Sequence, residues 1–223
     1  MMRRLAALFL TMILMTPMAR GQETAPSLAG PPAIAVARLN YGHEAADVPF
    51  SDAFLTQLKQ DTHIKALDHL VPVKIDSPQL REHPFAIMTG QGSFTLTLAQ
   101  RDHLQHYLQQ GGFLLASAHC SNKAWSASFR DVMTTLFPEQ ALTDLTIDHP
   151  VFHSVYEIVT SQHEKRRQEQ LPHLQSLTLD GRVVVIFSPE GLNDAADTCC
   201  CAGREVKGAH QLNINILAYG LTQ

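Results

Sequence analysis

A cysteine follows a short apolar segment near the middle of the chain, in the run AHCSN at residues 118–122. A thiolate is a strong nucleophile, and a tight turn after a buried strand presents such a nucleophile when small or left-handed-tolerant residues flank it. Both ends of this run hold residues of that kind. A nearby histidine would act as the base. The pattern makes Cys120, His119 and His149 the candidate catalytic residues.

The same region also contains ligands that suit a metal ion. Imidazole and thiolate groups are preferred by zinc and by copper. Adjacent cysteines in an extended chain face opposite ways, so three in a row do not easily converge on one ion. The candidate metal ligands are His119, Cys120, Cys199, Cys200 and Cys201.

A disulfide is the simpler interpretation of the cysteines. The chain has four of them, an even number, and its N-terminus predicts export to an oxidising compartment. We therefore expect at least one disulfide, and a bridge from Cys120 to one of the three cysteines at 199–201 is one of the pairings open to the chain. The sequence does not specify which one.

The first 21 residues have the pattern of a secretory signal peptide. Arg3 and Arg4 precede the apolar run Leu5–Met15, and a small-x-small cleavage signal ends at Gly21. The apolar run is too short to span a membrane, so membrane contact is expected only through an uncleaved signal segment. We expect a periplasmic or extracellular protein with a linker at 22–32 and one domain at 33–223.

The charge of the chain argues against nucleic acid as a partner. The formal net charge is −4 at pH 7, and loss of the three arginines in the signal segment lowers it to −7. A mildly acidic surface repels a polyanion. No nucleic-acid partner is expected.

Residues 84–121 predict a strand, a helix and a second strand that runs parallel to the first. The first strand is Phe85–Met88, and a helix begins at Leu98 after a Thr97–Gln100 capping box. Gly111-Gly112 ends the helix, and the next strand is Phe113–Ala116. Parallel strands end at one edge of the sheet, where open α/β sheets bind their ligands.

The remaining elements extend this pattern into one α/β domain. They are a strand at Ala33–Leu39, a helix at Phe50–Leu58, an edge-like strand at His69–Ile75, a helix at Ser128–Phe137, a hairpin of 177–179 and 182–187 around Asp180-Gly181, and a closing helix at Ala209–Leu221.

Polar residues at the predicted strand ends are the candidate ligand contacts. Neither a Walker pattern nor a complete G-x-G-x-x-G is present, so a nucleotide is not the expected ligand. A small molecule or a carbohydrate-like ligand is expected. The candidate ligand-binding residues are Tyr41, His43, Gly90, Gln91, Gly92, Ser121, Glu190, Asn193 and Asp194.

Several motifs in order resemble the bacterial domain-of-unknown-function 4159 family. They are ARLNYG at 37–42, MTGQG at 88–92, GGFLL at 111–115, SFR at 128–130, DHPVFHS at 148–154, and the NIN and AYGLT segments at 213–215 and 218–222. That family is similar to class I glutamine amidotransferase-like domains, including a trehalose-utilisation-like branch. The resemblance implies a flavodoxin-like, mostly parallel sheet with helices on both faces, and no established activity.

The chain departs from these relatives at positions that matter for chemistry. The family's Gly-Gly-Asp-Trp run is replaced by HEAAD at 43–47, and Ser117 and Ala118 stand where aspartates are common. Class I amidotransferases carry a catalytic histidine in F-H-P-E, whereas this chain has FSPE at 187–190. The resemblance therefore implies a triad without its base.

We expect an exported domain that binds a small or carbohydrate-like ligand. A cysteine- or metal-dependent hydrolase at the same edge of the sheet is the alternative, and a protein that assembles with others is a third hypothesis. The hydrolase requires a base within hydrogen-bond reach of Cys120. The binding module requires a polar concave site instead.

Overall fold

The computed structural model describes residues 32–42, 48–158, 161–163, 169–170, 173–193 and 206–223. Within the unit Pro32–Gln223, seven strands form one sheet in the order β2-β1-β3-β4-β9-β8-β5. These strands are β1 (Ala37–Asn40), β2 (Val71–Lys74), β3 (Phe85–Gly90), β4 (Phe113–Ala118), β5 (Thr143–Asp144), β8 (Gln175–Leu179) and β9 (Arg182–Ser188).

The sheet is mostly parallel. Strands β2, β1, β3, β4 and β9 run in one direction, β8 pairs antiparallel with β9, and β5 pairs antiparallel with β8 at the edge. Strand β2 lies at the edge, as expected for a strand that contains Pro72. The β8–β9 hairpin turns at Asp180 (φ 49°) and Gly181 (φ 79°), a pair of left-handed residues that matches strand twist. The predicted α/β class and mostly parallel sheet are confirmed.

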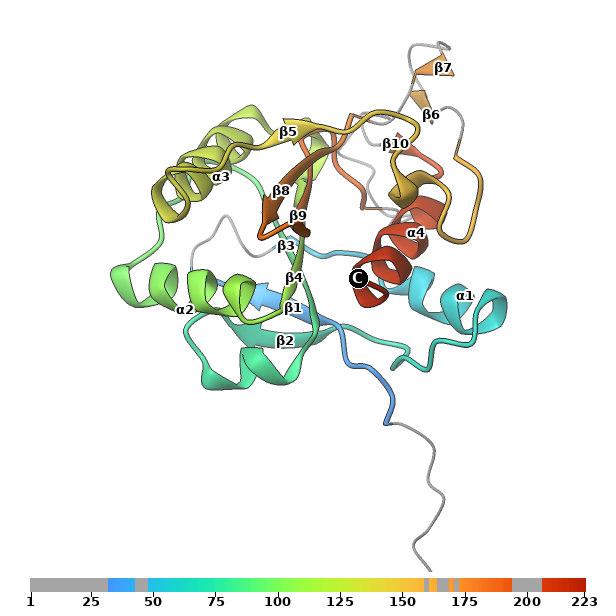
Figure 1. Ribbon diagram of the computed structural model, residues 1–223, viewed down its shortest axis with the longest axis horizontal. Helices are drawn as coiled ribbons and strands as arrows, with labels where there is room; N and C mark the ends of the chain where they lie inside the picture. Colours follow the sequence, from blue (N-terminus) through green and yellow to red (C-terminus); the bar gives the residue numbers. More distant parts are fainter. Residues whose placement is uncertain (1–31, 43–47, 159–160, 164–168, 171–172, 194–205) are drawn as a thin grey trace, which may run out of the picture. The chain divides into compact units, whose positions relative to one another are not determined.

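Helices cover both faces of the sheet (Figure 1). Helices α2 (Leu98–Gln109) and α3 (Lys123–Leu136) pack on one face, and α1 (Ala53–Asp61) and α4 (Ala209–Leu221) pack on the other. Alternate strand residues supply the two cores, because successive side chains point to opposite faces. None of the described helices is long and apolar enough to cross a membrane.

Short elements complete the described residues. A three-stranded sheet has the order β10-β6-β7. Its strands are β6 (Ser161–His163), β7 (Glu169–Gln170) and β10 (Val206–Lys207), and the 3-10 helices are η2 (Pro78–Glu82), η3 (His119–Ser121) and η4 (Pro150–Phe152).

The elements that were predicted best are those whose sequence pattern lies within a single segment. The Thr97 hydroxyl accepts a hydrogen bond from the Gln100 N–H at 3.2 Å and the Gln100 side chain accepts one from the Thr97 N–H at 3.0 Å, as in a capping box. Helix α4 has the predicted bounds Ala209–Leu221. Both predictions are confirmed, because a cap pair and an apolar period can be read within one segment.

Several predicted bounds are wrong, and the starts of three elements differ most. Helix α3 begins at Lys123, five residues before the predicted Ser128, because Asn122 caps it. Helix α1 begins at Ala53 rather than at Phe50, and Asp52 makes no side-chain cap hydrogen bond. The first strand is Ala37–Asn40 rather than Ala33–Leu39, since the described residues 32–36 form a single isolated bridge, from Ile34 to Ala66.

Candidate functional site at the carboxyl edge of the sheet

Tyr41 follows β1 and is buried, with 3% of its surface exposed. Its hydroxyl donates to the Thr89 carbonyl at 3.0 Å and accepts from the Trp125 indole N–H at 2.9 Å. Burial raises the pKa of Tyr41 to about 12, against a smaller opposite effect of the Trp125 hydrogen bond. The predicted ligand contact therefore lies in the core, where it joins β1, β3 and α3.

The turn after β3 is held by one side-chain amide. The Asn122 Oδ1 accepts from the Gly92 N–H at 3.1 Å and from the Trp125 N–H at 3.0 Å. Gly92 has φ 72°, in the left-handed region that favours glycine, while Gln91 is exposed and Gly90 is buried at the end of β3. Asn122 thus caps α3 and fixes the predicted Gly90–Gly92 turn in the same place.

The turn after β4 contains two consecutive non-glycine residues with positive φ. Cys120 has φ 51° and Ser121 has φ 56°. Each such residue costs about 1–3 kcal/mol, a cost that proteins keep mainly at functional or structurally fixed sites. The Ser121 hydroxyl donates to the Glu190 carbonyl at 2.9 Å, and the side chain of Cys120 already has a partner. Residues 119–121 are half-buried.

Asn193 holds the loop that follows β9. Its Nδ2 donates to the Pro49 carbonyl at 2.6 Å, and its Oδ1 accepts from the Ser51 N–H at 2.8 Å. Only 2% of the residue is exposed. Asn193 thereby connects the β9 end to the start of α1, so its polar atoms are used within the protein.

A layer of buried polar side chains lies beneath these turns, on the α1/α4 face. Thr89, Ser117 and Ser188 lie opposite one another near the carboxyl ends of three neighbouring strands. The Ser117 hydroxyl accepts from the Leu192 N–H at 2.9 Å. Asn213 of α4 donates to the Leu192 carbonyl at 2.8 Å. Within the described residues, two buried oxygens of this layer have no hydrogen-bond partner: Thr89 Oγ1 and Asn213 Oδ1.

His149 is not brought to Cys120. Its ring packs against Tyr219 with centroids 5.1 Å apart, and Tyr219 packs against Phe113, the first residue of β4. Cys120 lies beyond the other end of β4, which ends at Ala118. The two candidate catalytic residues therefore lie toward opposite ends of that strand. The His149 Nδ1 accepts from the Val151 N–H at 3.2 Å, and burial lowers the pKa of His149.

Several candidate residues lie outside the described part of the chain: His43, Asp194 and the cysteines Cys199, Cys200 and Cys201. The predicted zinc or copper set cannot be assembled from His119 and Cys120 alone. Among the described residues, no group of three histidine, cysteine or acidic side chains is placed to hold a metal ion.

A polar groove borders the Gly90–Gly92 turn. It has a volume of about 440 Å³ and lies between the segment after β3 and helix α3. Ser93, Thr95 and Asp131 are exposed, and Ser128 is half-buried. Sequence reasoning missed this groove, because its two walls are more than thirty residues apart in the chain. Its lining residues are Ser93, Phe94, Thr95, Ala127, Ser128 and Asp131.

A second missed group lies beside β8. The His173 Nε2 is 2.9 Å from the Asp144 Oδ1, and the Gln175 amide donates to the same oxygen at 2.8 Å. Hydrogen bonds from His173 and Gln175 lower the pKa of Asp144, which is nevertheless exposed. Arg130 connects this group to α3 by donating to Gln175 at 2.9 Å. No sequence signal pairs Asp144 with His173, because the contact depends on β5 joining β8.

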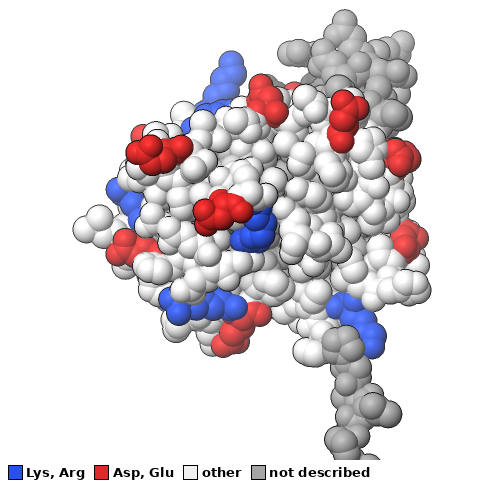
Figure 2. Space-filling model, in the orientation of Figure 1, with Lys and Arg blue, Asp and Glu red and all other residues white. Residues whose placement is uncertain are grey.

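Charged side chains are mixed on the face of the molecule drawn in Figure 2, where acidic and basic groups are interspersed and in places lie side by side. Such a surface has no extended field of one sign.

Residues 35–221 match the family model described as "Domain of unknown function (DUF4159)". The chain belongs to the DUF4159 family. The match includes every strand and α-helix described above, so the carboxyl edge and its groove are part of the DUF4159 domain. None of the curated proteins compared matches the chain.

The buried hydroxyls of Thr89 and Ser117 should differ in their effect on stability. We expect Thr89→Val to leave the free energy of unfolding within about 0.5 kcal/mol or to raise it, since its hydroxyl has no partner to lose. We expect Ser117→Ala to lower it by about 1–3 kcal/mol, because the buried Leu192 N–H loses its acceptor. Urea unfolding of both variants measures the difference. Equal losses in the two variants would contradict this account.

Proposed function

We propose that this protein binds a small carbohydrate-like ligand through the polar groove beside the Gly90–Gly92 turn. The observation that carries the proposal is the groove itself, which has a volume of about 440 Å³ and opens at the carboxyl edge. Open α/β sheets bind ligands outside the carboxyl ends of their strands. Tyr41 and Asn193 were expected to contact the ligand but are buried. The proposal assigns the ligand contacts to the exposed residues that line the groove instead.

The lining of the groove suits a neutral polyhydroxylated molecule. Ser93, Thr95 and Ser128 offer hydroxyls that can both donate and accept, and the Asp131 carboxylate accepts only. In the described part of the chain, the Asp131 carboxylate makes no hydrogen bond or ion pair. Sugar hydroxyls would donate to Asp131 and exchange hydrogen bonds with the serine and threonine hydroxyls.

The groove walls are fixed before a ligand arrives. The Phe94 N–H donates to the Ser128 hydroxyl at 3.0 Å, which joins the two walls directly. The Phe94 ring packs between Tyr41 and Trp125, with centroid distances of 5.0 and 5.5 Å. A preformed site lowers the entropic cost of binding.

We also propose a flavodoxin-like class for the domain, similar to class I amidotransferase-like domains. The support is the order of the five parallel strands, β2-β1-β3-β4-β9, which corresponds to 2-1-3-4-5. The amidotransferase chemistry does not follow, because Ser188 occupies the position at which those enzymes carry their histidine. Fold likeness alone does not assign a function.

Export and a structural disulfide complete the proposal. The support for export is the Arg3-Arg4 pair and apolar run of the N-terminus, which are typical of a cleaved signal. The support for the disulfide is the even number of cysteines in a chain expected to be exported, and the fact that Cys120 already has a partner in the structure. The proposed partner of Cys120 is one of the other three cysteines of the chain, Cys199, Cys200 and Cys201. A thiol held in this way is no nucleophile, which favours binding over cysteine-dependent hydrolysis.

Saccharide binding should depend on Asp131. We expect saturation-transfer NMR to detect trehalose or glucose on the mature protein, and Asp131→Asn to weaken binding about tenfold, because a charged acceptor contributes more than a neutral one. Asp102→Asn is the matched control, since this exposed carboxylate on α2 does not line the groove. The proposal fails if neither sugar binds, or if the two variants bind equally.

Export and the disulfide predict two properties of protein isolated from the periplasm. Its N-terminus should be Gln22, and thiol titration under denaturing conditions should find two thiols before reduction and four after it. Cys120→Ser should lower the free energy of unfolding by about 2–4 kcal/mol under oxidising conditions. A full-length cytoplasmic product with four thiols would contradict both parts.

A further inference from the structure

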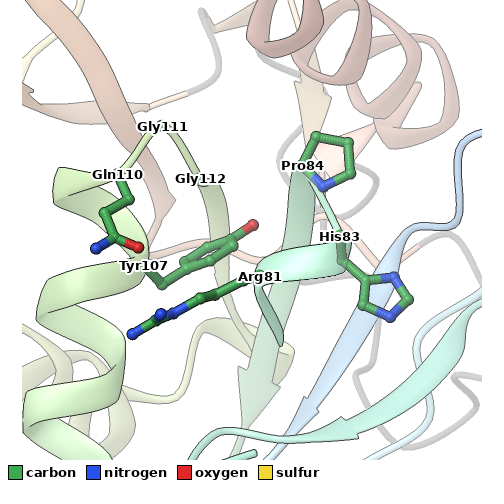
Figure 3. A pocket seen from close by; sticks show the side chains of 7 residues that line it. All are labelled: Arg81, His83, Pro84, Tyr107, Gln110, Gly111 and Gly112. Carbon is green, nitrogen blue, oxygen red and sulfur yellow. The ribbon is translucent and has the colours of Figure 1, made fainter. Parts of the chain in front are cut away.

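A second concave site lies at the opposite edge of the sheet, where β3 and β4 begin. Its volume is about 280 Å³. This pocket was not expected from the sequence. Its lining residues are Arg81, His83, Pro84, Tyr107, Gln110, Gly111 and Gly112. Figure 3 shows Arg81 of η2 alongside the Tyr107 ring, with Gln110 nearby from the end of α2. The elements that form it are therefore η2, the end of α2 and the starts of two strands.

Arg81 is the charged group of this pocket. Within the described residues its guanidinium makes no hydrogen bond or ion pair, so its planar set of N–H donors is open to a ligand. No aspartate or glutamate is among the lining residues. His83 does not compete for the same ligand, because its ring turns toward β1 (Figure 3) and its Nδ1 lies 2.8 Å from the Ala35 carbonyl.

A helix C-terminus would ordinarily repel an anion here, because its last carbonyls carry partial negative charge. In this protein a second guanidinium binds those carbonyls. Arg182 donates to the carbonyls of Gly111 at 3.2 Å, Leu108 at 3.3 Å and Gly112 at 3.4 Å. The carbonyls at the end of α2 are thereby neutralised, and a second positive charge lies beside the Gly111-Gly112 turn.

The floor of the pocket is rigid. Tyr107 is 3% exposed, and its hydroxyl donates to the Phe113 carbonyl at 3.1 Å. A Cβ at position 112 would lie 2.4 Å from the Tyr107 ring, so the ring packs directly on the glycine backbone. Only glycine at position 112 permits this close contact. The shape of the pocket is consequently set by the fold.

We propose that this pocket is a binding site for a small oxyanion, a carboxylate or a phosphate. Both groups carry several acceptor oxygens on one atom, which suits the fork of an arginine guanidinium. Arg81 supplies the positive charge, and the Gln110 amide at the mouth supplies a neutral hydrogen-bond donor. The charge of Arg182 makes the electrostatic potential near the pocket more positive. The site is separate from the saccharide groove, which lies at the other edge of the sheet, and does not depend on it.

Titration of the mature protein with inorganic phosphate and, separately, with acetate tests the proposal. Amide NMR signals of Gly111 and Gly112 should shift saturably with one or both ions. Phosphate alone would indicate a phosphate-bearing ligand, acetate alone a carboxylate, and both would support the shared oxyanion chemistry. No saturable shift with either ion would overturn the proposal.

Variants identify the residue responsible. Arg81→Gln should weaken the affinity for the bound ion about tenfold or more, and Arg81→Lys should have an intermediate affinity, because it keeps the charge without the fork. Lys123→Gln is the control, an exposed cation that does not line the pocket. Arg81 is exposed, so neither change should unfold the protein, and thermal unfolding verifies this. Equal affinity of Arg81→Gln and Lys123→Gln would overturn the proposal.

Discussion

The side-chain amide of Asn122 is the interaction on which the carboxyl edge depends. It accepts hydrogen bonds from the turn after β3 and from the first turn of α3, so one oxygen sets the spacing between them. Trp125 lies one turn into that helix and donates its indole N–H to Tyr41, which in turn donates to Thr89. The ends of β1 and β3 and the start of α3 thereby form one hydrogen-bonded network.

This hydrogen-bonded network determines which polar residues remain accessible to a ligand. The polar atoms of Tyr41 and Asn193 are used within the protein, where each holds separate segments together. The exposed hydroxyls of Ser93 and Thr95 lie instead on the segment that Asn122 and Ser128 fix against α3. The candidate groove therefore results from the hydrogen bonds that hold the segment after β3 against α3. The strained Cys120–Ser121 turn fits the same description, because the Ser121 hydroxyl holds it to the Glu190 carbonyl in the loop after β9.

Local signals predicted much of the fold. The Thr97–Gln100 capping box, the Asp180-Gly181 turn and the apolar period of Ala209–Leu221 are each contained within one segment, so each could be read directly. The start of α3 was missed because Asn122 was interpreted as part of a turn around Cys120. Its cap contact with the Trp125 N–H is local, whereas its second contact, with the Gly92 N–H thirty residues earlier, appears only in the folded structure.

The candidate site was less predictable than the fold, because its contacts join segments that are far apart in the chain. The type of Tyr41 suggested a ligand contact, but its partner Trp125 lies 84 residues further along the chain. The groove and the Arg81 pocket each combine segments that only the folded sheet brings together. Strand order could place polar residues at one edge. Strand order could not determine which of these polar residues form hydrogen bonds with each other.

Hydrogen exchange of backbone amides in Asn122→Ala tests this account most directly. The amides of Gly92 and Trp125 lose their acceptor, so both should exchange at least about tenfold faster than in the unaltered protein, while amides inside β4 remain protected. Trehalose or glucose binding should weaken in the same variant, since one wall of the groove is released. Unchanged exchange at Gly92 and Trp125 would contradict the claim that Asn122 holds the carboxyl edge together.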